Sequence, residues 1–411
     1  MSETSWPRAG RRVRVEPAVL LPSPAFASHY PRVRNLELID PGPRNAMEQS
    51  WKRGVFPAGQ IEVFDLPGAY VIDECLVLDR HLQIIENASD IYSEAEIARA
   101  IAAIQAHEAA HTLPHYDRPG IVSKRRAANN YGHFLMEMLP MAVLGQLCAG
   151  TSDVWYIVHH VLAPTLDAVF RAFRLLGVPM SRVLVPTWSE PVWFDRLIIV
   201  RGLTSHGTFM SPLALFGTER LVQALIARDG GIPDPRYERI FVRRVPGWGR
   251  GRDMHNEEEV ARRLGTLGFV DIEPGVMSLE EQIHAFASAR HVVGVVGAAM
   301  TNIAFCRPAT KVTMLCPGTF PDTFFWYIAT HRQLDYLEIR GDQTVTEGLN
   351  SWEAGSPSGS PTSSIWRRCA PAPADWRSVP LRGDVGSGIQ ARCIADAWRG
   401  QSGTSRRRPG R

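Results

Sequence analysis

The sequence has few cysteines, and none has the spacing by which cysteines bind zinc or exchange disulfides. Six cysteines occur in 411 residues, and no two of them form a C-x-x-C pair. This absence excludes a zinc knuckle and a dithiol redox motif, so reduced thiols are expected.

Long apolar runs and a large net charge are also missing. No apolar run approaches the roughly 20 residues that a membrane-spanning helix needs. The net charge is only +3, which gives no strong attraction to nucleic acid. Prolines and charges interrupt residues 1–24 where a signal peptide would have its apolar core, so a cytoplasmic location is expected. Peripheral membrane contact and the oligomeric state stay open.

What is present is the composition of a globular protein, with 45 % apolar and 21 % charged residues. From about residue 119, short apolar segments alternate with amphipathic ones. This pattern predicts α/β architecture with parallel sheets covered on both faces, arranged as two stacked domains. We expect an irregular arm at 1–55, α/β domains at 56–232 and 233–345, and a largely disordered low-complexity tail at 346–411.

The segment HEAAH is the one stretch that suggests a metal enzyme. His107 and His111 are four residues apart, with Glu108 beside the first, a spacing that on a helix can hold zinc and a general base. The extended three-histidine pattern is not met, because Pro114 and Asp117 stand where it requires glycine and histidine. We therefore favour the interpretation that the two histidines simply lie on a helix surface, and we keep a zinc hydrolase as the alternative.

The segment HVVGVVGAAMTN indicates an anion site. An apolar strand ends at Val296, and Gly297, Ala298 and Ala299 open a helix. Small residues let backbone N–H groups approach a ligand closely, and the helix start favours negative charge such as phosphate. Tight packing of strand against helix explains the same residues equally well.

Four arginines strengthen the phosphate interpretation. Arg243 and Arg244 end the strand RIFVRR, and Arg250 and Arg252 follow in a glycine-rich loop. One guanidinium group can bind two phosphate oxygens at once. Exposed arginines in a loop, however, need no ligand. No D-x-D motif occurs. A bound diphosphate would therefore be neutralised by arginines and helix N–H groups rather than by a metal.

The segment NNYGHFLMEMLP offers a general base. His133 and Glu137 are four residues apart and share one helix face. A carboxylate beside an imidazole fixes its tautomer and raises its basicity. A buried histidine satisfied by Glu137 is the structural alternative.

Together these segments resemble glycosyltransferase family 61 over about residues 120–340. NNYGHFLMEMLPMAVL is similar to its N-terminal signature, RIFVRR and the helices after it to its arginine strand, and HVVGVVGAAMTNIAF to its Gly-Ala-x-x-Thr-Asn turn. The resemblance implies a GT-B architecture, in which two Rossmann-like domains face an interdomain cleft. It also implies inverting, metal-independent transfer of a sugar from a nucleotide-sugar substrate to a hydroxyl acceptor. No cofactor is implied, and surface polysaccharide or glycoconjugate synthesis is the expected role.

The resemblance also implies roles for particular residues. His133 would reach the cleft from the acceptor-side N-terminal domain, with Glu137 beside it. Arg243 and Arg252 match the arginines that meet the diphosphate. The remaining matches lie on the helix before the turn and in the turn itself: Gln282, Gly297, Ala298, Thr301 and Asn302.

The sequence departs from the family at two positions. Many members carry histidine where this chain has Val296, and arginine where it has Met141. These departures leave the donor undetermined. They also keep open a third class, a non-catalytic protein of the same fold that binds a nucleotide or a sugar.

Overall fold

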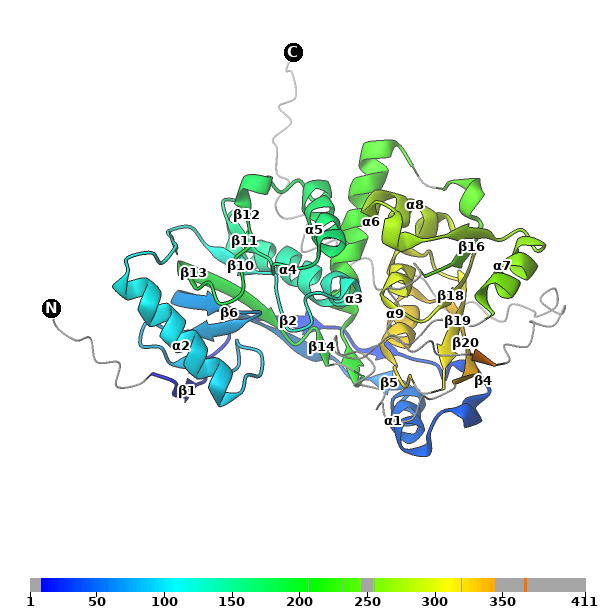
Figure 1. Ribbon diagram of the computed structural model, residues 1–411, viewed down its shortest axis with the longest axis horizontal. Coiled ribbons are helices and arrows are strands. Elements are labelled where there is room, and N and C mark those ends of the chain that lie inside the picture. Colours follow the sequence, from blue (N-terminus) through cyan, green and yellow to red (C-terminus); the bar gives the residue numbers. More distant parts are fainter. Residues whose placement is uncertain are drawn as a thin grey trace, which may run out of the picture. The chain divides into compact units, whose positions relative to one another are not determined.

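The computed structural model describes residues 9–205, 207–231, 233–244, 254, 256–318, 320–343 and 366–367 (Figure 1). The expected low-complexity tail at 346–411 lies outside these residues except for the short strand β21 (Trp366–Arg367). In the described part of the chain, most strands belong to two sheets, and no helix is long and apolar enough to cross a membrane.

Ten of the described strands form the first sheet, in the order β1-β8-β7-β6-β13-β10-β11-β12, with β2 beside β6 and β9 beside β13. The bounds are β1 Arg12–Val13, β2 Val19–Ser23, β6 Gly59–Ile72, β7 Leu76–Leu78, β8 Ile84–Ile85, β9 His115–Tyr116, β10 Gly120–Val122, β11 Trp155–Ile157, β12 Val183–Leu184 and β13 Val192–Arg201. Strands β13, β10, β11 and β12 are parallel neighbours, as the alternating pattern predicts.

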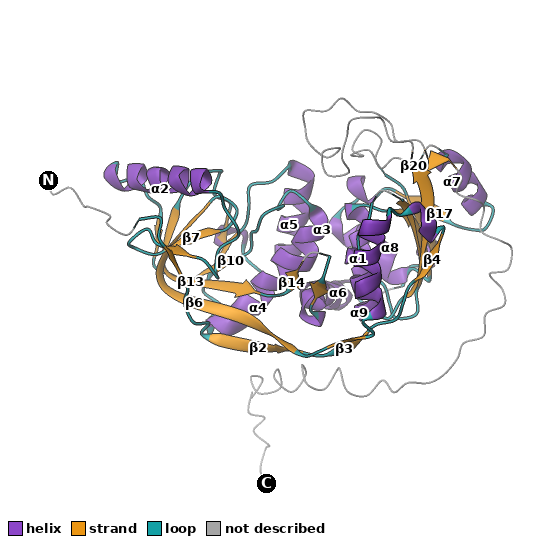
Figure 2. Cartoon of the chain, turned by 90° about the horizontal axis from the view of Figure 1, so that it is seen from below, coloured by secondary structure: helices purple, strands orange, loops and turns teal. Residues whose placement is uncertain are grey.

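The expectation of parallel sheets holds for only part of the first sheet. Strand β6 runs antiparallel to β2, β7 and β13, and β6 and β13 lie side by side in Figure 2. The Pro67–Gly68 pair lies within β6, where Gly68 has a φ of +75°. Glycine adopts that conformation at low cost, so the strand continues through it. The pairing of β6 with β13 is non-local, and local periodicity carries no information about it.

The second sheet is parallel through its centre. Its order is β17-β16-β18-β19-β20, with β4 parallel and β21 antiparallel to β20. The bounds are β4 Arg32–Arg34, β16 Arg239–Val242, β17 Val270–Ile272, β18 His291–Val295, β19 Lys311–Pro317 and β20 Asp335–Gln343. From β16 to β20 the strand order is 2-1-3-4-5, so the winding reverses between β16 and β18. In doubly wound sheets, ligands bind at the carboxyl ends of the strands at this reversal.

Helices cover both faces of the second sheet. The α-helices of the described chain, including those away from this sheet, are α1 Pro41–Lys52, α2 Glu94–Ala109, α3 Tyr131–His133, α4 Leu139–Ala149, α5 Ala163–Leu175, α6 Phe216–Asp229, α7 Glu257–Gly265, α8 Leu279–Ser288 and α9 Phe324–Arg332. Phe241 and Val293 pack against α7, whereas Ile240 and Val292 join a core that includes α8 and α9. Figure 1 shows α7 on one side of this sheet and α8 and α9 on the other. Alternate strand residues therefore face opposite layers, as a sheet buried on both sides requires.

The N-terminal segment is more regular than the sequence predicts. Within 9–55, β2 extends the first sheet and β4 extends the second, and α1 buries Trp51 almost completely. Strands of three to five residues show too little alternation to be recognised before their distant partners are known. The remaining short strands form two pairs: β3 Phe26–Ala27 with β5 Val55–Phe56, and β14 Thr204–Ser205 with β15 Phe209–Met210. The described residues all belong to one compact unit, so the domain boundary expected near residue 232 remains a prediction.

Candidate functional site

The glycine turn lies at the carboxyl edge of the second sheet, where the winding reverses. Val242 of β16 pairs with Gly294 of β18 in parallel register, so the residues after each strand leave the sheet at the same edge. After Val296, Gly297 caps the 3-10 helix η7 (Ala298–Phe305). The predicted turn from strand to helix is therefore present. The first N–H groups of such a helix have no partner within it and favour an anion.

Arg244 lies directly against this turn. Its Nη1 donates a hydrogen bond of 3.0 Å to the carbonyl oxygen of Val296. A Cβ on Gly297 would lie only 2.9 Å from the same nitrogen, so glycine permits this close approach. The side chain thus brings a guanidinium group to the start of η7, as expected of an arginine that binds phosphate.

Arg243 has a different environment. Its guanidinium group lies 3.6 Å from a carboxylate oxygen of Glu257 and 3.4 Å from one of Asp271, and it also contacts Glu258. These carboxylates belong to α7 and β17 and already balance its charge. A contact between Arg243 and a diphosphate remains a prediction, and Arg252 lies outside the described residues.

Two of the predicted binding residues form a buried hydrogen-bonded chain. Asn302 is fully buried, and its Nδ2 donates a 2.7 Å hydrogen bond to Oε1 of Gln282. Gln282 in turn donates from Nε2 to the carbonyl oxygen of Met277 at 3.1 Å. These side chains fix α8 to η7 beneath the turn. Their described contacts are with protein groups, and direct contact with a substrate remains a prediction.

Helix α3 carries the predicted base and contacts η7 directly. The side chain of Asn130 accepts a 2.8 Å hydrogen bond from the N–H of Gly132 and so caps the helix. Tyr131 donates from its hydroxyl to Oδ1 of Asn302 at 2.7 Å. A Cβ on Gly132 would lie 2.6 Å from Oγ1 of Thr301, which only a residue without a side chain allows. The segment with His133 and the turn after Gly297 are thus in contact.

His133 and Glu137 are paired, as the sequence predicts. Nδ1 of His133 lies 3.3 Å from Oε1 of Glu137, an ion-pair distance longer than a short hydrogen bond. Hydrogen bonds of catalytic residues are often long before substrate binds. The segment between them is π-helical, from Phe134 to Met138, a distortion that sequence spacing did not predict and that is frequent at functional sites.

The Glu137 carboxylate is buried but well supported. Thr204 donates to its Oε1 at 2.9 Å, and a guanidinium nitrogen of Arg125 lies 3.6 Å from its Oε2. Burial alone would raise the pKa of Glu137, but His133, Arg125 and Thr204 together hold that pKa below its ordinary value. The group is therefore an anion at neutral pH and is suited to orient the imidazole of His133.

Sequence reasoning missed three residues of this site. Tyr131 lies inside the quoted motif but drew no functional interpretation, and Thr204 supports Glu137 from β14. Phe324 begins α9, and its ring centroid lies 6.3 Å from that of His133. Thr204 and Phe324 are far from His133 in the sequence, so no local signal relates them to it.

The HEAAH segment does not form the face that the zinc alternative requires. Helix α2 ends at Ala109, and His111 has a φ of +54°, so the two histidines do not share one helix face. Glu108 accepts a 2.8 Å hydrogen bond from the Tyr70 hydroxyl, and His107 contacts Thr112. The described residues contain no group of three metal-ligating side chains.

A comparison with known protein families finds a match that covers most of the region just described. Residues 131–313 match the family model Glycosyltransferase 61, a span that begins at Tyr131 and ends within β19. No curated protein matches the sequence. The match includes His133, Glu137, Arg244 and the turn at Gly297. It identifies the chain as a glycosyltransferase that carries a family 61 domain.

Proposed function

We propose that this glycosyltransferase transfers a sugar from a nucleotide-sugar donor to a hydroxyl acceptor, with inversion and without a metal ion. One observation carries the proposal. The helix that holds His133 packs, through Tyr131 and Gly132, on the helix that begins at Gly297. A basic residue and an anion site are thereby held close together.

The donor diphosphate would bind at the turn. Arg244 and the first N–H groups of η7 supply positive charge at the point where the second sheet reverses its winding. Charge-assisted bonds of this kind stabilise a leaving group as its charge develops. These protein groups would stabilise the charge of the diphosphate in place of a metal ion.

The acceptor hydroxyl would be activated by His133. With Glu137 ionised beside Nδ1, the proton of the imidazole stays on that nitrogen, and Nε2 acts as the base. The hydroxyl oxygen attacks the anomeric carbon, its proton passes to Nε2, and the bond from that carbon to the diphosphate oxygen breaks. Attack opposite the leaving group inverts the anomeric centre. A cytoplasmic role in surface polysaccharide or glycoconjugate synthesis is the setting we propose.

The test separates donor binding from transfer. A thermal-shift panel of UDP, GDP, ADP, CDP and dTDP first identifies the nucleotide, and the matching nucleotide sugars then serve as donors. We expect His133→Ala to abolish transfer while the nucleotide still stabilises the protein as in the wild type. Glu137→Gln, which keeps the shape but not the charge, should retain a reduced rate. Near-normal turnover by His133→Ala would remove His133 from the mechanism, and a panel without any thermal shift would contradict the donor site.

A further inference from the structure

A turn after β12 exposes the side chain of Trp188. Half of this side chain is accessible, which is unusual for a tryptophan, and it lies between β12 and β13. Single exposed apolar residues are common and need no explanation by themselves. Trp188 differs because two independent features hold it in place.

The first feature is a locked and strained turn. The N–H of Glu190 donates to the carbonyl of Thr187 at 3.2 Å, and the carboxylate of Glu190 accepts from the N–H of Thr187 at 2.9 Å. Between them, Ser189 has a φ of +62°, a conformation that costs a non-glycine residue about 1 kcal/mol or more. Such strain persists only where surrounding contacts enforce it.

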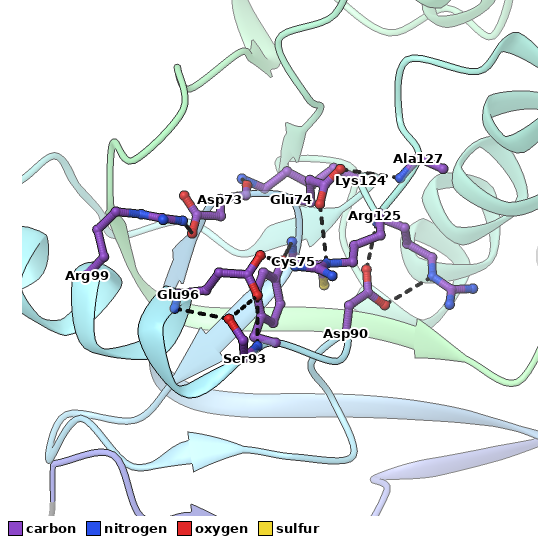
Figure 3. A network of polar contacts seen from close by, with 12 residues as sticks. Asp73, Glu74, Cys75, Asp90, Ser93, Glu96, Arg99, Lys124, Arg125 and Ala127 are labelled. Atoms are coloured by element: carbon purple, nitrogen blue, oxygen red, sulfur yellow. Dashed lines mark hydrogen bonds and ion pairs between the residues drawn. The ribbon is translucent and has the colours of Figure 1, made fainter. Parts of the chain in front are cut away.

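Asp73, in the turn between β6 and β7, supplies such a contact. Its Oδ1 accepts a 3.2 Å hydrogen bond from the N–H of Ser189. The buried Nζ of Lys124 donates to the carbonyl of Asp73 at 2.7 Å, and Arg99 approaches the Asp73 carboxylate at 3.7 Å (Figure 3). The turn that carries Trp188 therefore rests on an anchored residue rather than on a free loop.

The second feature is a buried histidine against the indole. The rings of His159 and Trp188 meet edge to face, with centroids 4.6 Å apart. His159 is 3 % exposed, and neither of its ring nitrogens has a hydrogen-bond partner among the described residues. Burial, and next the ammonium group of Lys124, lower the pKa of His159 to about 4, so its ring is neutral at pH 7 and has one donor and one acceptor. The neutral ring therefore packs against the indole and fixes its orientation.

This arrangement lies on the same sheet edge as the base. His159 follows β11, Trp188 follows β12, and α3 with His133 follows β10. These three strands are parallel, so their carboxyl ends share one edge. The loops are also joined, because the N–H of Leu162 donates to Oδ1 of Asn129 at 3.3 Å.

We propose that Trp188 is a stacking platform for a sugar ring of the acceptor, which makes the acceptor a glycan rather than a polypeptide. The inference rests on the proposed function, because it assigns the acceptor of that same site. The face of an indole is electron-rich, and the C–H groups on one face of a pyranose carry partial positive charge, so the two stack. His159 does not reach the sugar itself, because both of its ring nitrogens are buried; its ring positions the indole.

The test uses the full chain labelled with 5-fluorotryptophan. Because the chain has 11 tryptophans, Trp188→Phe is needed to assign the fluorine resonance of Trp188. The probes are methyl pyranosides and disaccharides of hexoses, N-acetylhexosamines, pentoses and uronic acids, with a serine-containing peptide for comparison. We expect at least one saccharide, and not the peptide, to shift this resonance. With that saccharide as acceptor, Trp188→Ala should raise the acceptor KM about tenfold and leave donor hydrolysis without acceptor unchanged.

Leu147→Ala, which removes an apolar side chain of similar exposure from α4, is the matched control and should leave the acceptor KM unchanged. The proposal is overturned if no saccharide shifts the resonance, if the peptide does, or if protein concentration alone does, which would indicate contact between copies. Failure of every nucleotide diphosphate to bind would instead overturn the proposed function, so the two failures are distinguishable.

Discussion

The hydroxyl of Tyr131 donates a 2.7 Å hydrogen bond to Oδ1 of Asn302. This bond connects the helix that carries His133 with the helix that begins after Gly297. Asn302 is held in turn by Gln282, so the connection extends to α8. Burial raises the pKa of the Tyr131 hydroxyl, which therefore stays protonated and remains a donor at every pH of interest.

Removing this hydroxyl should weaken both stability and transfer. In Tyr131→Phe the buried oxygen of Asn302 loses its donor, and leaving such a group unpaired costs about 1–3 kcal/mol. We expect urea unfolding to report that loss. We also expect a larger fold decrease in kcat than in nucleotide affinity, because His133 would be held less firmly relative to the Gly297 turn.

Tyr156→Phe is the control for this experiment. Tyr156 is also buried, but burial alone raises the pKa of its hydroxyl, with no hydrogen-bond contribution from a described residue. Its variant should change the free energy of unfolding by less than about 0.5 kcal/mol. Equal effects of the two substitutions would show that the bond between Tyr131 and Asn302 has no particular importance.

The two neighbouring arginines should differ in nucleotide binding. Arg244 lies against the Gly297 turn, whereas the charge of Arg243 is balanced by Glu257, Glu258 and Asp271. We expect Arg244→Ala to weaken binding of the nucleoside diphosphate about 10- to 100-fold, the value of a charge-assisted hydrogen bond. Arg243→Ala should weaken that binding less, because its charge is already shared with three carboxylates. Isothermal titration of both variants decides, and a larger effect at Arg243 would contradict the assignment.

Much of the donor side could be predicted from the sequence. A strand followed by Gly297 and small residues, and a second strand ending in two arginines, fix local structure through short-range rules. Once both strands belong to one parallel sheet, their carboxyl ends must share an edge. Which arginine faces the turn was not predictable, because the orientation of Arg243 depends on α7 and β17.

The acceptor side was less predictable, because its contacts are long-range. Thr204 supports Glu137 from 67 residues away, and Asp73 anchors Ser189 across 116 residues. The π-helical distortion after His133 has no periodic signal either. The antiparallel pairing of β6 with β13 was missed for the same reason.

His159 should make the protein less stable in acid. Its pKa is about 4 in the folded state and 6.5 in a model peptide, so between these values the unfolded chain binds a proton that the folded chain does not. The stabilisation is therefore complete above pH 6.5 and is lost as the pH falls toward 4, by at most about 3 kcal/mol.

His159→Phe keeps an aromatic edge against Trp188 but cannot titrate. Urea unfolding of both proteins between pH 7 and pH 4.5 should show a smaller loss for the variant. His160 is the exposed neighbour, and His160→Gln should keep the pH dependence of the wild type. If His159→Phe also kept that pH dependence, burial of the His159 imidazole would not be the cause of the lower stability in acid.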